Sequence, residues 1–350
     1  MSKIVIIGGG GYLGQKLVNN LIIEGHDVYV KVRNNANILI RNNKAKLFKE
    51  NAEIDTVDFI INLAYPSGGK QYNTIADINN IFKTIKEIST DGTRIIFTSS
   101  LAVFGYDLER EQITKKITRR RDYPYIEGKI ELENLLLEFF DSDKIDILRL
   151  GNIWGPGCPN WTVNIANRIY FGQPVAMKDN IGYSNCTDVE NVISYISFLI
   201  KKDGDREIQF HHLAEFSNIR WLYWFEKIES KLGMAPVYQE SDGGMKENSR
   251  LKQLLKIVTG KSNSNLAQLL WNGRYSGSYL RSFISLLPQD IIFVLNKKLN
   301  PSISASKNEK VHYQVMGCEK QFKHIIDSRW KQKVDLEVSW NNIEKWIYET

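Results

Sequence analysis

The sequence predicts an α/β fold in which a doubly wound parallel sheet is joined to a smaller C-terminal lobe. Two observations predict the sheet. Short apolar runs alternate with amphipathic helical patterns over roughly the first 150 residues, and a glycine-rich turn, Gly8 to Gly14, directly follows the first apolar run. The lobe is predicted by a third observation, because the alternation ends near Gly151 and turn signals such as Gly155-Pro156-Gly157 follow.

The expected elements follow from their apolar patterns. Short apolar runs predict buried strands at 3–7, 28–32, 57–64, 94–98 and 145–150. Amphipathic patterns predict a helix that follows Gly14 and runs through about Ile23, and helices at about 75–88 and 130–140. Because parallel sheets of this kind bind ligands at the carboxyl ends of their strands, the motifs that follow these strands are candidate functional sites.

The pattern also suggests a domain organisation. We expect residues 1–155 to form the sheet domain and residues 156–350 to form mainly the lobe. Further elements are expected as helices near 164–171, 188–201 and 218–232 and a strand near 208–213. Segments at about 183–215 are expected to return to the sheet core, and the stretch at about 243–320 stays unassigned.

Composition narrows the class of protein. The chain of 350 residues is 43% hydrophobic and 25% charged, which is typical of a globular protein. Its three cysteines are widely spaced and have no ligand-like histidine cluster beside them, so neither a disulfide framework nor a metal site is expected. No apolar run is long enough to span a membrane, and the N-terminal run lacks the features of a signal peptide, which predicts a cytoplasmic location.

The net charge of +6 is modest, and its densest part is a basic run at 115–121. This run is either a solvated loop or a basic surface beside a site that takes a phosphate-bearing substrate. Nucleic acid is not an expected partner, because no aromatic-interleaved or zinc-finger pattern accompanies these charges.

The glycine-rich turn predicts a dinucleotide site. Gly8, Gly11 and Gly14 stand directly after a strand and at the opening of a helix, with Tyr12 and Leu13 between the last two. Glycines at this place permit a tight turn, close approach of the backbone to a pyrophosphate, and close packing of helix on strand. A Rossmann-type nucleotide-binding domain is therefore expected.

The end of the second strand bears on the choice of cofactor. An acidic residue there accepts hydrogen bonds from the ribose 2′-hydroxyl of NAD(H), but this chain has Val32-Arg33-Asn34 instead. Arg33 can pair with a 2′-phosphate, which favours NADP(H), with NAD(H) as the alternative. The competing interpretation is a surface arginine, in which case Arg33 carries no information about the cofactor.

A tyrosine and a lysine one helical turn apart form a candidate catalytic pair. Tyr125 and Lys129 share their spacing with Tyr12 and Lys16 and with Tyr223 and Lys227, so the spacing alone is weak. Only Tyr125 and Lys129 stand between the strand that ends in Thr98-Ser99-Ser100 and the strand that runs into Arg149-Leu150-Gly151-Asn152. A phenol titrates near pH 10 and acts as a base at neutral pH only where a neighbouring cation stabilises its anion.

These motifs resemble the extended branch of the short-chain dehydrogenase/reductase superfamily, which contains nucleotide-sugar epimerases and reductases (the NAD-dependent epimerase/dehydratase family). The resemblance runs from Lys3 to about Gly233 and returns faintly at 338–348. Its most specific marks are the segment 99–105, Tyr125-x-x-x-Lys129 with Glu133 following, and the segment 149–156.

The resemblance implies catalytic roles. Tyr125 would exchange a proton with the substrate carbinol or carbonyl oxygen, and Ser100 would hydrogen-bond the same oxygen. Lys129 would lower the pKa of Tyr125 and hold the nicotinamide ribose. Asn80 would help to order the proton relay, with its neighbour Asn79 as a competing match.

Binding residues are implied in the same way. Leu63, Ala64 and Ser99 would contact the cofactor, and Asn152 would contact substrate phosphate or sugar unless it merely forms a turn. The acid of Thr187-Asp188-Val189 would be structural. The chain departs from the family where Asn62 and Tyr65 replace the usual His and Ala, and where Gly182-Tyr183-Ser184-Asn185 replaces an Arg-Asp-Phe segment.

One departure narrows the reaction. Dehydratases of this branch carry Asp-Glu directly after the catalytic hydroxyl, whereas this chain has Leu101-Ala102. We therefore expect an NADPH-dependent reductase of a nucleotide-activated keto-sugar, acting at C4, in surface polysaccharide biosynthesis. The alternatives are an NAD-dependent C4 epimerase, and an inactive NADP-binding protein with a regulatory or structural role. The expected partner is the nucleotide sugar, and a homodimer is left open.

Overall fold

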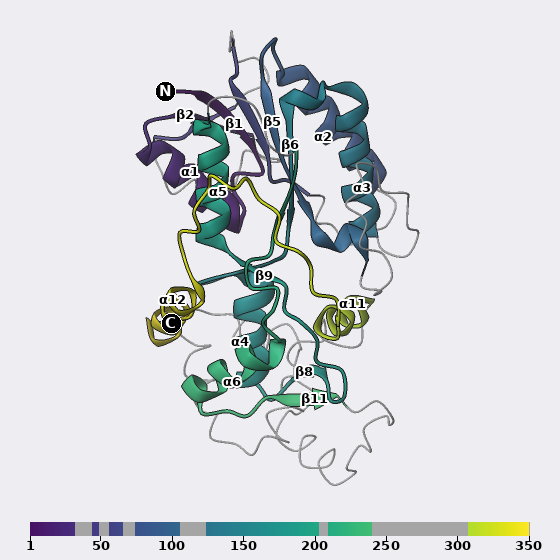
Figure 1. Ribbon diagram of the computed structural model, residues 1–350, viewed down its shortest axis with the longest axis vertical. Helices are drawn as coiled ribbons and strands as arrows, with labels where there is room; N and C mark the ends of the chain where they lie inside the picture. The colour runs from purple at the N-terminus through teal and green to yellow at the C-terminus, as the bar shows by residue number, and fades with distance from the viewer. Residues whose placement is uncertain are drawn as a thin grey trace, which may run out of the picture. The chain divides into compact units, whose positions relative to one another are not determined.

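The computed structural model describes residues 1–31, 44–48, 56–65, 74–105, 124–202, 209–239 and 307–349 (Figure 1). The chain divides into two compact units. The sheet unit comprises Met1–Pro159, Asn185–Asn218 and Gln321–Thr350, and the second unit comprises Asn160–Ser184 and Ile219–Lys320.

A seven-stranded parallel sheet forms the sheet unit, which confirms the predicted fold class. Its strand order is β10-β6-β5-β4-β1-β2-β3. The strands are β1 Lys3–Ile7, β2 Asp27–Lys31, β3 Lys46–Leu47, β4 Phe59–Asn62, β5 Arg94–Ser100, β6 Ile145–Leu150 and β10 Phe210–Leu213. The order reverses between β1 and β4, and ligands of such sheets bind at the carboxyl ends of the strands that flank this switch point.

Helices cover both faces of the sheet (Figure 1). One face packs against α1 Tyr12–Ile23 and α5 Val189–Lys201, and the other against α2 Thr74–Ile88 and α3 Pro124–Phe139. The strands are buried on both sides because they are continuous apolar runs, as β6 shows with all six residues buried. Short turns follow β5 at η1 Leu101–Phe104 and α3 at η2 Ser142–Lys144.

Helix α3 begins earlier than its apolar pattern predicts. The pattern indicates a start near Ile130, whereas the helix begins at Pro124. Proline is favoured in the first turn because its missing N–H is not needed there and its φ angle suits a helix. The consequence is that Tyr125 and Lys129 lie on one helix, in successive turns.

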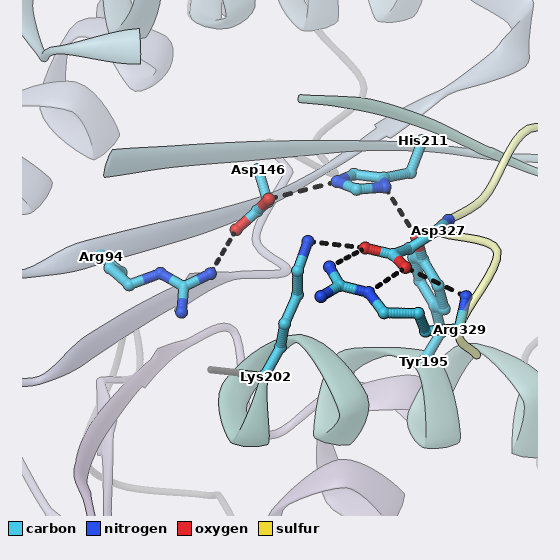
Figure 2. A network of polar contacts seen from close by, with 7 residues as sticks. All are labelled: Arg94, Asp146, Tyr195, Lys202, His211, Asp327 and Arg329. Atoms are coloured by element: carbon cyan, nitrogen blue, oxygen red, sulfur yellow. Dashed lines mark hydrogen bonds and ion pairs between the residues drawn. The ribbon is translucent and has the colours of Figure 1, made fainter. Parts of the chain in front are cut away.

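The sheet unit is completed by the C-terminal stretch. Ile325 exchanges two backbone hydrogen bonds with His212 of β10, at 2.7 and 2.9 Å. Beyond it the carboxylate of Asp327 is fully buried, and it accepts hydrogen bonds from Lys202 at 2.6 Å and from Arg329 at 2.8 Å (Figure 2). The stretch ends in α12 Leu336–Glu349. A small parallel pair of strands, β7 Asn152–Trp154 and β9 Cys186–Asp188, also belongs to this unit.

The second unit contains helices around a two-stranded parallel sheet. Its core contains Trp221, Trp224 and Phe225, which are all fully buried. The elements are α4 Asn164–Tyr170, β8 Pro174–Met177, α6 Trp221–Leu232, β11 Val237–Gln239 and α11 Lys307–Met316, with the turn η3 Pro159–Val163 ahead of α4. Most of the stretch at about 243–320 lies outside the described residues. Within the described part of the chain, no helix is both long enough and apolar enough to cross a bilayer.

Candidate active site

The glycine turn after β1 is built by close contacts. Gly8 has a φ angle of +87°, and a Cβ there would lie 2.7 Å from the backbone nitrogen of Ala64. A Cβ on Gly14 would lie 2.5 Å from the carbonyl oxygen of Gly8. These two glycines therefore let the turn and α1 pack closely on the strands, as expected of a dinucleotide fold.

Gly11 has a different environment. It is the N-cap of α1, and the nearest atom to a Cβ built there is 3.6 Å away. Among the described residues, no side chain caps the first turn of α1, so backbone N–H groups remain available at the positive end of the helix dipole. The two tight glycines and this uncapped end fit the pyrophosphate of a dinucleotide.

Tyr12 and Leu13 use their side chains for packing. The Tyr12 hydroxyl donates to the carbonyl oxygen of Pro156 at 3.0 Å, and burial raises its pKa strongly. Leu13 belongs to the core between α1 and the sheet. Any contact of these residues with a cofactor would therefore come from their backbone.

The end of β4 lies against the glycine turn. Asn62 is fully buried, and its Oδ1 accepts a hydrogen bond from the backbone of Ala64 at 3.1 Å. Its carbonyl oxygen accepts from the Thr98 hydroxyl at 3.0 Å. The predicted cofactor contacts Leu63 and Ala64 therefore lie at the switch point, held in a defined turn. Among the described residues, Asn62 Nδ2 has no acceptor.

The two serines at the end of β5 differ in their surroundings. Ser99 is buried, and within the described chain its hydroxyl has no hydrogen-bond partner. Ser100 is the N-cap of η1 and accepts a hydrogen bond from the backbone of Ala102 at 3.2 Å. Leu101 is buried beside it. The position where a dehydratase carries its acid pair is thus filled by apolar side chains.

Tyr125 meets Ser100 at this edge of the sheet. Its residue surface is 43% exposed, yet its hydroxyl is desolvated by the surrounding protein, and this raises its pKa. The Ser100 hydroxyl lies close enough to act in the opposite direction, lowering the pKa of Tyr125. The structure therefore brings together two of the predicted catalytic residues, and the phenol stays protonated at neutral pH.

Lys129 lies one turn further along α3. Its side chain is buried, and Nζ donates to the carbonyl oxygen of Thr98 at 2.7 Å. Burial lowers the pKa of Lys129 to about 8, while the charge of Glu133 opposes this shift. Nζ lies 6.0 Å from the centroid of the Tyr125 ring. For its two remaining N–H groups, no acceptor is found in the described ranges.

Three predicted residues stand apart from this group. Asn80 is exposed in α2, where its carbonyl oxygen accepts from the Thr84 hydroxyl at 2.8 Å. Asn152 is half-buried at the start of β7, and its backbone donates to the carbonyl oxygen of Asn185 at 3.0 Å. Arg33 lies outside the described residues.

Sequence reasoning did not assign a role to Tyr65. Its ring centroid lies 4.6 Å from that of Tyr125, with an angle of 64° between the planes. The available signal was its place directly after the carboxyl end of a parallel strand, where ligand-contacting residues gather. The acid of Asp188 caps α5, and its carboxylate accepts from the backbone of Glu190 at 2.8 Å.

Comparison with known proteins places this geometry in a family. A family model described as the NAD dependent epimerase/dehydratase family matches residues 4–205. None of the curated proteins matches the sequence significantly. Solved structures are similar in fold. The UDP-glucuronic acid 4-epimerase of Bacillus cereus, in complex with UDP-glucuronic acid and NAD, has a TM-score of 0.55 at 17% identity, over 68% of this chain and 85% of that one.

Two further structures show the same likeness. The ADP-L-glycero-D-manno-heptose-6-epimerase of Helicobacter pylori has a TM-score of 0.54 at 17% identity, over 68% of this chain and 85% of that one. The dTDP-glucose 4,6-dehydratase of Bacillus anthracis, in complex with NAD, has a TM-score of 0.53 at 16% identity, over 69% and 86%. At such identities the likeness shows the fold, whereas the family model covers more than half of the sequence. The chain therefore belongs to the NAD-dependent epimerase/dehydratase family.

Proposed function

We propose that the chain is an NAD(P)-dependent reductase that acts on a ketone of a nucleotide-activated sugar, at C4, in the building of surface polysaccharide. The observation that carries the proposal is the approach of the Ser100 and Tyr125 hydroxyls at the carboxyl end of β5, with the buried ammonium of Lys129 one turn away. A hydroxyl pair of this kind fits the oxygen of a ketone or of a secondary alcohol, since each hydroxyl can donate to it.

The protonation state of Tyr125 supports the reducing direction. Because burial raises its pKa, the phenol holds its proton at neutral pH and can donate it to a carbonyl oxygen as negative charge develops there. Ser100 orients that oxygen by a second hydrogen bond. When bound, a nicotinamide cofactor supplies the hydride. Oxidation of an alcohol would instead need the phenolate, which this environment disfavours.

Cofactor binding would rest on the residues at the switch point. Gly8, Gly11 and Gly14, with the N-terminus of α1, would hold the pyrophosphate, and the turn after β4 together with Ser99 would lie beside them. Lys129 would donate its two remaining N–H groups to ribose hydroxyls. Arg33 supports NADP(H), while the NAD bound in the similar Bacillus cereus enzyme supports NAD(H).

A second candidate is a C4 epimerase. It is favoured by the similarity to the UDP-glucuronic acid 4-epimerase, and it would use the same Ser100, Tyr125 and Lys129. A dehydratase is not favoured, because Leu101 and Ala102 offer no carboxylate next to Ser100. In either case the substrate would be a nucleotide sugar, which Asn152 would contact.

The test is a ligand screen followed by turnover. Thermal unfolding is measured with NADPH, NADH, NADP⁺ or NAD⁺, each with UDP-, dTDP-, GDP- and CDP-sugars, because ligands of the native state raise its apparent stability. We expect stabilisation by NADPH and loss of absorbance at 340 nm with a keto-sugar. Retention of NAD through gel filtration, with no response to NADPH, would overturn the reductase in favour of the epimerase. Cofactor binding without turnover on any sugar would favour the inactive alternative.

A single substitution tests the assignment of Tyr125 as the proton donor. Tyr125→Phe is expected to lower kcat by about 10²-fold to 10⁴-fold, the usual contribution of a positioned proton donor, without change in the unfolding temperature. Tyr223→Phe is the matched control, because Lys227 Nζ lies 5.6 Å from the Tyr223 ring in a second Tyr-x-x-x-Lys pair in α6. Full turnover by Tyr125→Phe would remove the assignment.

A further inference from the structure

The ammonium of Lys129 is enclosed by three aromatic rings. Nζ lies 5.1 Å from the ring centroid of Phe97, 5.3 Å from that of Tyr65 and 6.0 Å from that of Tyr125. The rings come from β5, from the segment after β4 and from α3, so residues far apart in sequence converge on one charged group. Aromatic faces attract a cation, and the attraction is greater where water is excluded, as it is around this buried side chain.

The rings of Phe97, Tyr65 and Tyr125 form an aromatic cage around the Lys129 ammonium, and Tyr65 has a distinct place in it. Phe97 is fully buried in the sheet core, and Tyr125 is the proposed proton donor. Tyr65 is half-buried and touches both reacting groups, because its ring packs edge to face with Tyr125 at 4.6 Å and also faces Lys129. Such a geometry is the preferred one for an aromatic pair, so it restrains the Tyr125 ring as well as the lysine side chain.

We propose that Tyr65 is a positioning residue of the active site, which holds the Tyr125 ring and the Lys129 ammonium in the orientation that the reaction needs. The catalytic role of Tyr65 rests on the proposed function, whereas the packing of the three rings around Lys129 does not depend on it. Tyr65 acts through its ring, since the ring makes both contacts. A phenylalanine at this position should therefore serve, and an alanine should not.

Removal of the ring has a predicted effect on Lys129. Water would enter the space that Tyr65 leaves, and desolvation is the main cause of the low pKa of this lysine. Loss of the cation–π contact with Tyr65 acts in the opposite sense, but Phe97 and Tyr125 stay beside the ammonium. In Tyr65→Ala the pKa of Lys129 should therefore rise from about 8 towards the ordinary value for lysine.

The first measurement needs neither cofactor nor substrate. The protein is prepared with ¹³C-labelled lysine, and the chemical shift of the Lys129 Cε is followed by NMR across a pH series. In Tyr65→Ala the midpoint of the Lys129 titration should rise by about one pH unit or more, whereas in Tyr65→Phe it should stay within about 0.3 units. Phe139→Ala is the matched control. Phe139 lies at the far end of α3 and is 48% exposed. Like Tyr65 it contacts both a ring and a lysine, because its ring centroid lies 4.9 Å from that of Phe140 and 4.3 Å from Lys86 Nζ.

The second measurement is the dissociation constant of NADPH or NADH, which is determined from the quenching of tryptophan fluorescence. The dissociation constant should rise at least about threefold in Tyr65→Ala and stay unchanged in Tyr65→Phe and Phe139→Ala. If the alanine variant does not fold, Tyr65→Leu replaces it, because leucine fills most of the volume without an aromatic face. An unchanged Lys129 midpoint in the folded variant overturns the inference. If the wild-type protein binds neither cofactor while the midpoint shifts as expected, the proposed function fails and the cage stands.

Discussion

Glu133 and Arg149 form a bidentate ion pair that is almost fully buried. Arg149 donates to the two carboxylate oxygens at 3.2 and 2.8 Å, and the side chains are 2% and 0% exposed. Glu133 lies in α3, one turn beyond Lys129, and Arg149 lies in β6. The pair therefore fixes the helix that carries Tyr125 and Lys129 to the centre of the sheet.

Breaking this pair should cost much of the stability of the protein. Glu133→Ala leaves the Arg149 guanidinium buried without its counter-charge, and loss of one partner of a buried pair costs about 3–5 kcal/mol. The free energy of unfolding in urea measures it. Glu87→Ala is the control, because its pair with Lys83 is 61% and 73% exposed and should contribute less than about 0.5 kcal/mol. Equal losses in the two variants would contradict the structural role.

Two glycines of the turn should differ in how much an added methyl group lowers the unfolding free energy. Gly14→Ala places a Cβ 2.5 Å from a backbone oxygen that cannot move freely, so we expect a loss of about 1–3 kcal/mol in unfolding free energy. Gly11→Ala meets its nearest atom at 3.6 Å with an ordinary φ of −75°, so it should cost less than about 1 kcal/mol. Urea titration compares them. A Gly14→Ala protein as stable as Gly11→Ala would contradict the close packing of Gly14 against Gly8.

Replacement of Lys129 should stabilise the protein at neutral pH. Its pKa falls from the ordinary value near 10.5 to about 8 on folding, so the folded state disfavours the charged form. Between these two values the unfolded chain binds the extra proton, and stability rises with pH. Lys129→Met should therefore unfold with a free energy about 1–3 kcal/mol higher at pH 7, with the gain vanishing near pH 10.5. Urea titrations at pH 7, 9 and 10.5 check this, and a variant less stable than wild type at pH 7 would refute it.

Asp327 should give the opposite pH dependence. Hydrogen bonds from Arg329 and Lys202 hold the pKa of its carboxyl well below the usual range (Figure 2). A carboxylate of this kind stabilises the folded state above its unfolded pKa, near 3.9, and the contribution is lost as pH falls through the folded value. We expect Asp327→Asn to lose about 3 kcal/mol at pH 7, since Lys202 is left buried and unpaired, and progressively less below about pH 4.

The matched control for Asp327 is Asp141→Asn. The Asp141 side chain is 76% exposed and pairs with Lys144 at 3.4 Å, so its loss should be small at every pH. Urea titrations between pH 3 and 7 compare the two variants. If Asp327→Asn loses the same free energy at pH 3 as at pH 7, the stabilisation does not come from the ionised carboxylate.

The sequence predicted the sheet well because apolar runs bounded by turn residues leave few alternatives. The start of α3 was missed because Tyr125 and Ile126 continue no clear apolar stripe. Only the proline marks the N-terminal end of this helix. The contact between Tyr65 and Tyr125 depends on how the segment after β4 meets a helix that follows it by about sixty residues, which no local pattern encodes. The resemblance placed Ser100 and Tyr125 in one site, whereas the roles of Asn80, Asn152 and Arg33 stay predictions.

The sheet unit draws its residues from three separate stretches of chain, the last of them Gln321–Thr350. Translation therefore releases the glycine turn and the proposed catalytic helix from the ribosome long before the partners of Tyr195, Lys202 and His212 exist. Until Ile325 and Asp327 arrive, the β10 edge and the end of α5 have no cover from that stretch. A nascent chain should thus resist protease only when residues up to about 330 have left the ribosome, and a nucleotide should not protect shorter fragments.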